Sequence, residues 1–320
     1  MKTPHSGEPW ARRKGNRTSA HDDGRPLCGR GNFRRGVVRV GPRVRPNITK
    51  RTSGQYPFFA SRGPVLLGSD PVQTPAKMWL AVCVKAREQV PVGWDGAVNA
   101  WRVAGSVYRM GRREWLTAAG WQQAYDDGVR TVIDLRNPAE RQPRPADPEV
   151  GEALAPFDVV HAPTEDPDHP EFKALCVPYL NDPAFYAANA RFFPDRLAAV
   201  FRNVAKSPGG VVIHCSAGRD RSGMIAAMLQ DLAGATDDAI VSAYQAAMRG
   251  INERHRTMTT PHPHERYLDQ DELAPLLEIR GAGVLQFVRS LKTRDYLLTH
   301  GVTPAELDRI LLLLGAEGGL

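Results

Sequence analysis

The sequence predicts an α/β fold in which a central, largely parallel sheet is flanked by helices. Short segments rich in β-branched residues at 131–135, 157–161 and 211–213 are the predicted strands. Segments with helical spacing lie between these strands and after the last one, an alternation typical of a parallel sheet. The chain has 320 residues, of which 42% are apolar, so it is long enough to bury a sizeable core.

Capping signals and apolar spacing define the helices around these strands. Gly128 lies just past the end of one helix, and residues 303–306 form a capping box for the last. The expected helices cover residues 116–127, 197–204, 221–234, 236–251 and 304–315. Residues 163–194 are rich in acidic and aromatic residues and in proline, and we predict that they form a lid insertion with a helical patch at 185–193. A polar loop is expected at 254–268.

Charge divides the chain into two parts. Residues 1–77 contain 16 Lys and Arg but only four acidic residues, a net charge of +12, whereas the whole chain carries +7. Residues 78–320 are therefore net negative, at −5. We expect residues 1–77 to be a basic, Gly- and Pro-rich leader that is either disordered or not translated, and residues 90–320 to form the folded domain. Because the positive charge is confined to the leader, no nucleic-acid partner is expected.

Neither a membrane span nor a secretory signal is visible. The longest apolar runs, such as that at 78–84, are far shorter than the ~18 residues that a bilayer requires. The cysteines form no CxxC pair, so neither a structural zinc site nor a disulfide framework is expected. They are Cys28, Cys83, Cys176 and Cys215. We expect reduced thiols in a cytoplasmic protein without a transmembrane segment.

The segment that indicates chemistry is HCSAGRDRSG at residues 214–223. Its core is a cysteine followed after five residues by an arginine, which places a nucleophile (Cys215) and a guanidinium (Arg221) at the two ends of one loop. The bare pattern is weak, because Cys28 and Arg34 in the leader also satisfy it. Only at Cys215 does a predicted strand precede the loop and a predicted helix follow it. Loop amides and the helix N-terminus can then face one phosphate.

This context predicts a role for each loop residue. The positive field favours a thiolate at Cys215, which would attack phosphorus without a metal or other cofactor. Arg221 is expected to bind two phosphate oxygens through the transition state. Ser222 would hydrogen-bond the sulfur, and Gly218 would supply backbone freedom. The expected substrate-binding residues are Ser216, Ala217, Gly218, Arg219 and Ser222.

The loop resembles the signature of Cys-dependent protein tyrosine phosphatases and is most similar to a bacterial branch whose loop reads HCxAGKDRTG. Four further segments resemble that branch's patterns Asn-x-Arg-Asp-x-Gly-Gly, Tyr-Arg-Ser, Asp-Leu-Arg and Gly-x-Thr-Pro-x-Glu-Leu. They lie at 99–105, 108–110, 134–136 and 301–307, and the resemblance covers about 95–315. It implies a phosphotyrosine-phosphatase-like fold and a catalytic domain at 90–320. It also implies activity on phosphotyrosine and, in some members, on phosphoserine, phosphothreonine or phosphoinositides.

The chain departs from this branch at several positions, and these bear on substrate choice. Trp101 and Arg102 stand where the branch has Arg-Asp, and Ala104 and Met110 replace a Gly and a Ser. Arg219 replaces the lysine of the loop. At the rim of the loop, Arg219 would either recognise a second anionic group or simply be solvated.

Two residues compete for the role of proton donor to the leaving group. The bacterial branch implies Asp220, beside Arg221, which would act first as acid and then as base. Many tyrosine phosphatases instead use an aspartate on a separate flexible loop. Asp166 in the predicted lid is the best candidate for that alternative, with Glu165 and Asp168 close by. A solvated acidic loop without a catalytic role is the plainer interpretation of this segment.

Two other polar clusters favour structural interpretations. Asp134 and Arg136 lie at a strand end, where they either reach the site or form a structural ion pair. His255, His262 and His264 lie in a Pro-rich segment without a carboxylate or cysteine at ligand spacing, so no metal site is expected.

These observations predict an enzyme that hydrolyses phosphate monoesters, with protein phosphotyrosine as the favoured substrate, through a phosphocysteine on Cys215. The alternative substrates are those of a dual-specificity or phosphoinositide phosphatase, favoured if the pocket is wide and basic near Arg219. A catalytically silent phosphate-binding module is disfavoured, because Cys215, Asp220 and Arg221 are all present. The expected partner is thus a phosphorylated protein or a phosphoinositide.

Overall fold

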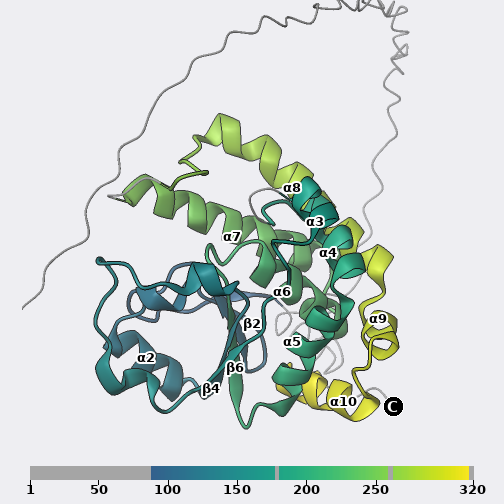
Figure 1. Ribbon diagram of the computed structural model, residues 1–320, viewed down its shortest axis with the longest axis horizontal. Helices are drawn as coiled ribbons and strands as arrows, with labels where there is room; N and C mark the ends of the chain where they lie inside the picture. Colours follow the sequence, from purple (N-terminus) through teal and green to yellow (C-terminus); the bar gives the residue numbers. More distant parts are fainter. Residues whose placement is uncertain (1–87, 177–179, 259–261, 317–320) are drawn as a thin grey trace, which may run out of the picture. The chain divides into compact units, whose positions relative to one another are not determined.

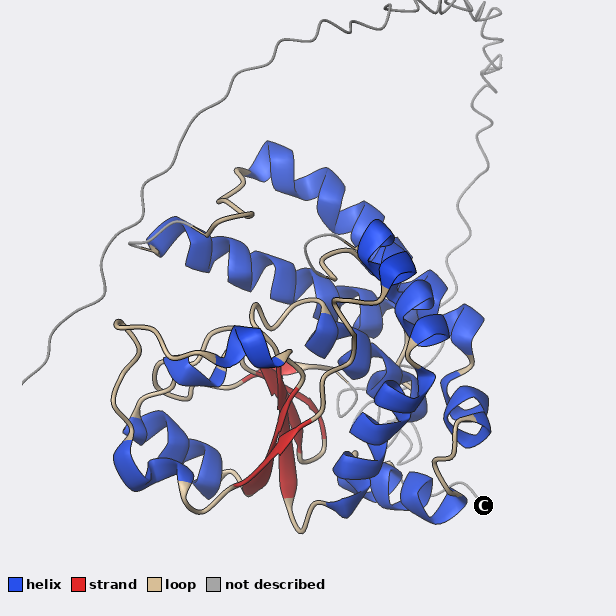
Figure 2. Ribbon diagram, in the orientation of Figure 1, coloured by secondary structure: helices blue, strands red, loops and turns tan. Residues whose placement is uncertain are grey.

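The computed structural model describes residues 88–176, 180–258 and 262–316. The predicted leader and the cysteine–arginine pattern at Cys28 lie outside these residues. Within them, six strands form one sheet in the order β1-β2-β3-β6-β4-β5. The sheet is red in Figure 2, with helices on both sides of it. The strands are β1 (Val90–Pro91), β2 (Trp101–Ala104), β3 (Val107–Met110), β4 (Val129–Asp134), β5 (Asp158–His161) and β6 (Gly210–His214). Pairing is antiparallel from β1 to β3 and parallel from β3 through β6 and β4 to β5, which confirms the predicted fold class.

Both faces of the sheet are covered, and alternate residues of the central strands supply two hydrophobic cores. In β6, Val211 and Ile213 face the larger core, whereas Val212 faces the smaller one. The smaller core includes Trp121 of α2 (Ala118–Asp126). Burial of β6 on both faces holds the strand that leads into the cysteine loop.

The larger core lies beneath the remaining helices. Figure 1 shows α2 on one face of the sheet and α5 and α6 on the other, with α7 and α8 beyond α6. The helices are α3 (Pro170–Leu175), α4 (Tyr186–Phe192), α5 (Pro194–Lys206), α6 (Arg221–Leu232), α7 (Asp237–Thr257), α8 (Gln270–Leu291), α9 (Thr293–Thr299) and α10 (Pro304–Leu313). Helix α6 is buried along almost its whole length, so the start of this helix is fixed from every side.

The predicted strands and helices are confirmed, and the structure adds elements that were not predicted: strands β1 to β3 and helices α3, α8 and α9. Helix α7 continues to Thr257, so the start of the segment expected as a polar loop is helical. Helix α8, which was not predicted, contains Pro275. The helix tolerates Pro275 near its start, where Asp269 and Glu272 form a capping box that stabilises the first turn.

The segment predicted as a lid contains helices α3 and α4 and a short 3-10 turn, Pro183–Phe185. Its aromatic side chains contribute to the larger core, because Phe172, Tyr186 and Phe193 are all buried. The segment therefore packs into the domain, and its role as a lid stays a prediction. In the part of the chain that the structure describes, no helix is long and apolar enough to cross a membrane.

Candidate active site

The cysteine loop joins the end of β6 to the start of α6. Cys215 follows the last strand residue, and Arg221 is the first residue of the helix. Gly218 at the middle of the loop has a φ of +71°, and a Cβ there would lie 2.6 Å from the backbone nitrogen of Gly111. Both the backbone conformation and the close approach to β3 therefore require glycine at this position.

Side chains from outside the loop hold two of its carbonyl groups. The Asn99 amide donates to the carbonyl of Ala217 (3.0 Å) and to that of Ala247 in α7 (2.9 Å), which ties the loop to that helix. Arg109 of β3, 1% exposed, donates to the carbonyl of Gly218 at 2.6 Å. Both residues lie in the segments that resemble the bacterial phosphatases, and the structure shows what they contact.

Two further loop carbonyls also accept hydrogen bonds from outside the loop, and the loop amides remain available to a ligand. The backbone amide of Arg112 donates to Ser216 (3.0 Å), and the Tyr186 hydroxyl donates to the Asp220 carbonyl (3.0 Å). In the described part of the chain, no amide from 216 to 220 donates a hydrogen bond to a protein acceptor. A loop with bonded carbonyls and available amides is suited to an anion.

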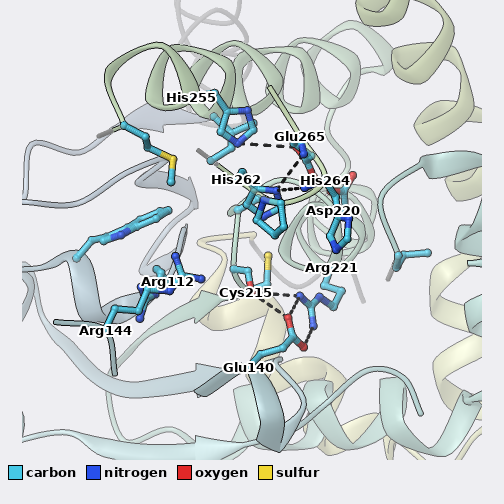
Figure 3. Close-up of a pocket in the computed structure, with 17 residues that line it drawn as sticks. Arg112, Glu140, Arg144, Cys215, Asp220, Arg221, His255, His262, His264 and Glu265 are labelled. Atoms are coloured by element: carbon cyan, nitrogen blue, oxygen red, sulfur yellow. Dashed lines mark hydrogen bonds and ion pairs between the residues drawn. The ribbon is translucent and has the colours of Figure 1, made fainter. Parts of the chain in front are cut away.

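Arg221 is oriented by a carboxylate that sequence reasoning missed. Its two terminal nitrogens each donate to one oxygen of Glu140 at 2.6 Å, and the Ser216 hydroxyl donates to Glu140 at 2.9 Å (Figure 3). Burial alone would raise the pKa of Glu140, but the hydrogen bonds and charge of Arg221 lower it overall. The charged pair holds the guanidinium plane at the end of the loop.

Cys215 lies at a cavity of about 220 Å³. Its sulfur is 3.4 Å from the Ser222 hydroxyl, and the side chain is buried. In Figure 3, Cys215 lies between the Arg221–Glu140 pair and the segment carrying His262 and His264. The cavity also has an apolar lining, formed by Trp115, Leu180, Ile251 and Met258 among others.

Asp220 and Arg219 form a pair with further partners. One oxygen of Asp220 accepts from Arg219 at 2.8 Å, and the other accepts from the Tyr244 hydroxyl at 3.0 Å. Arg219 also donates to both oxygens of Glu265, at 2.9 and 3.1 Å. Arg219 is only 6% exposed, so the solvated rim position considered from the sequence is wrong. Asp220 lines the cavity with Cys215, whereas Arg219 does not.

The acids of the predicted lid do not share one environment. Asp166 is 43% exposed at its side chain and pairs with Arg196 at 3.3 Å, and it does not line the cavity. Glu165 is 2% exposed and lies 3.6 Å from the Arg221 guanidinium. Burial raises the pKa of Glu165, although Arg221 opposes this. Glu165, rather than Asp166, is the lid acid nearest to the cysteine loop.

Asp134 and Arg136 form a buried ion pair beneath the site. Their side chains are fully buried and 2.9 Å apart, and Arg136 also binds Glu114 at 2.7 Å. Neither Asp134 nor Arg136 lines the cavity, so the structural interpretation holds. Burial lowers the pKa of neighbouring His214 to about 4, even though Asp134 opposes this shift.

The three histidines converge on the cavity, yet they bind protein groups. His262 accepts at Nδ1 from the backbone amides of His264 and Glu265, and Nδ1 of His255 lies 3.3 Å from the carbonyl of Arg266. Within the described residues, no group of three or more His, Cys, Asp or Glu side chains could hold a metal ion.

Comparison with known proteins places the chain in a protein family. A sequence profile of the tyrosine phosphatase family matches residues 99–314, about two thirds of the chain. The chain belongs to the tyrosine phosphatase family. Membership of this family supports phosphatase activity for the chain. The matched region contains the whole cysteine loop. No curated protein sequence matches the chain significantly.

Several solved structures of other proteins are similar to this member of the tyrosine phosphatase family. TpbA of P. aeruginosa is 19% identical, with 67% of this chain and 96% of TpbA covered and a TM-score of 0.34. The catalytic domain of the PP-IP phosphatase Siw14 of S. cerevisiae is 13% identical, with 65% and 96% covered and a TM-score of 0.31. Human DUSP28 is 16% identical, with 71% and 97% covered and a TM-score of 0.23.

Proposed function

We propose that this chain hydrolyses phosphate monoesters, with protein phosphotyrosine as the favoured substrate, through a phosphocysteine on Cys215. The observation that carries the proposal is the loop itself. A buried cysteine follows a strand, an arginine begins the next helix in a charged pair with Glu140, and the amides between them have no acceptor in the described part of the chain. This arrangement can bind a phosphate dianion beside a sulfur nucleophile.

The first chemical step transfers the phosphoryl group to sulfur. The Cys215 thiolate attacks phosphorus, an S–P bond forms, and the ester P–O bond breaks with both electrons leaving on oxygen. Asp220 donates a proton to that oxygen, while Arg221 and the loop amides stabilise the charge on the other phosphate oxygens. The product alcohol or phenol then leaves.

The second step regenerates the enzyme. Asp220, now a carboxylate, accepts a proton from water as the water oxygen attacks phosphorus. The P–O bond forms, the S–P bond breaks, and sulfur leaves as a thiolate that the Ser222 hydroxyl, 3.4 Å away, can stabilise. Asp220 keeps the role of acid and base in this proposal because it lines the cavity and Asp166 does not.

The cavity lining favours an aromatic phosphate ester. Trp115, Leu180 and Met258 provide apolar surface for a phenyl ring whose phosphate reaches Cys215. Arg219, which would favour a phosphoinositide if it faced the cavity, is bound to two carboxylates instead. A cytoplasmic location and the absence of a cofactor stay predictions from the sequence.

A substrate panel tests the proposal. We expect the highest kcat/KM for phosphotyrosine peptides, with lower values for phosphoserine peptides and phosphoinositides, in buffer containing a metal chelator. A preference for phosphoinositides over phosphotyrosine would contradict the substrate assignment. Absence of turnover of every substrate would contradict the enzymatic function as a whole.

A further inference from the structure

The guanidinium of Arg219 is fully engaged by two carboxylates. Its Nε donates to Asp220, and its terminal nitrogens bind both oxygens of Glu265. The pair with Glu265 joins the cysteine loop to the segment between α7 and α8, 46 positions further along the chain. A planar guanidinium held in this bidentate way has the geometry with which arginine binds a phosphate group.

Glu265 lies in a wall between two cavities. It lines the cavity that contains Cys215 and also a neighbouring cavity of about 230 Å³, which Arg219 and Arg280 line as well. Arg219 lines only the second cavity. The Glu265 carboxylate therefore stands between the substrate cavity and the loop cation.

His255 and His262 do not replace Arg219 as the counter-charge of Glu265. Burial lowers the pKa of His255 and that of His262, so both rings are largely neutral near pH 7. Nε2 of His255 lies 4.0 Å from Glu265, further than either arginine contact. The two hydrogen bonds from Arg219, at 2.9 and 3.1 Å, are shorter than that contact.

We infer that Glu265 is a specificity-determining residue that selects substrates with a single phosphate by occupying the Arg219 surface that a second phosphate would bind. The inference rests on the proposed function, because it assumes that the first phosphate binds at Cys215. An intramolecular carboxylate is always present at high effective concentration, so a second substrate phosphate must displace it. Substrates with two neighbouring phosphates should then bind little more tightly than substrates with one.

Competitive inhibition tests this inference without requiring that the probe be hydrolysed. We would measure Ki for an inositol bisphosphate with adjacent phosphates and for the matching monophosphate, against hydrolysis of an aryl phosphate. In the wild type the two Ki values should agree within about threefold. In Glu265→Gln, which releases Arg219 from a charged pair, the bisphosphate should bind at least about tenfold more tightly relative to the monophosphate.

Matched variants show whether the tighter binding of the bisphosphate in Glu265→Gln depends on Arg219. Glu253→Gln removes an exposed carboxylate that pairs with Arg256 on α7, and it should leave the Ki ratio unchanged. In the double variant Arg219→Gln/Glu265→Gln the gain should disappear. Glu265→Asp, which keeps the charge but shortens the side chain, should give a smaller gain and serves if Glu265→Gln does not fold.

The outcomes separate this inference from the proposed function. If aryl phosphate is hydrolysed but the ratio in Glu265→Gln and Glu265→Asp stays at the wild-type value, the role of Glu265 is refuted and the phosphatase assignment stands. A wild-type enzyme that already binds the bisphosphate tenfold more tightly would refute it as well. If no aryl phosphate is hydrolysed, the proposed function fails, and the same ratio measured by calorimetric binding still decides whether Glu265 masks Arg219.

Discussion

Replacing Glu140 with glutamine should disable Arg221 while the loop sequence stays intact. Glu140 accepts two hydrogen bonds from Arg221 at 2.6 Å and one from Ser216 at 2.9 Å. Glutamine keeps one oxygen, but its amide group presents hydrogens where the second oxygen met the guanidinium. One charge-assisted hydrogen bond is lost, which costs roughly 1.5–3 kcal/mol. Because the contact orients Arg221 for the transition state, kcat/KM should fall by about 10- to 150-fold.

The assay is steady-state hydrolysis of an aryl phosphate, with folding checked by circular dichroism. Glu152→Gln, a substitution at an exposed residue of the 3-10 turn Gly151–Leu154, is the matched control and should retain wild-type kinetics. Both substitutions remove one negative charge, but only Glu140 lines the cavity and pairs with Arg221, so a difference between the two variants reports the loss of the Glu140 carboxylate at the site. A folded Glu140→Gln enzyme with kcat/KM within threefold of wild type would refute the reasoning.

Three further predictions concern the proton donor, acid stability and the leader. Asp220→Asn should flatten the basic limb of the kcat–pH profile and slow poor leaving groups most, whereas Asp166→Asn should do neither; the reverse pattern would assign the acid to the predicted lid. Because the His214 pKa is about 4 when folded and near 6.5 when unfolded, the unfolded state binds more protons between these values. Stability should fall by roughly 3 kcal/mol as the pH drops across that range, and denaturant titrations of His214→Asn should show a shallower fall. Deleting residues 1–77 should leave solubility and kcat nearly unchanged, since that segment has little apolar content; insoluble protein would show that it contributes to the fold.

The features predicted from sequence are those that local patterns determine. A β-branched strand, a cysteine and a helix start lie next to one another in the chain, so the loop from Cys215 to Arg221 could be found from spacing and context. Gly218 follows from the same logic, because a tight loop needs a residue that tolerates positive φ. The sheet order could be expected only in outline, since β1 to β3 show no strong strand signal.

The partners of the loop residues could not be predicted, because they are distant in sequence. Glu140 lies 81 positions from Arg221, and Glu265 lies 46 positions from Arg219. Acidic residues are common on loops, and no pattern marks which one meets an arginine after folding. The one available signal for Glu140 was its place just after a parallel strand, at the edge where sites form in α/β sheets. The burial of Arg219 reflects the tertiary contact with Glu265, which its own neighbours in sequence do not reveal.

Trapping the covalent intermediate tests the central claim most directly. Wild-type enzyme would be mixed with an aryl phosphate, quenched in acid within milliseconds, digested and analysed by mass spectrometry. We predict one phosphoryl group on the peptide that contains Cys215, at its sulfur, and none on the same peptide from Cys215→Ser, which should also retain less than a hundredth of wild-type turnover. A phosphoryl group on another residue, or turnover by Cys215→Ser above that level, would contradict a phosphocysteine mechanism at Cys215.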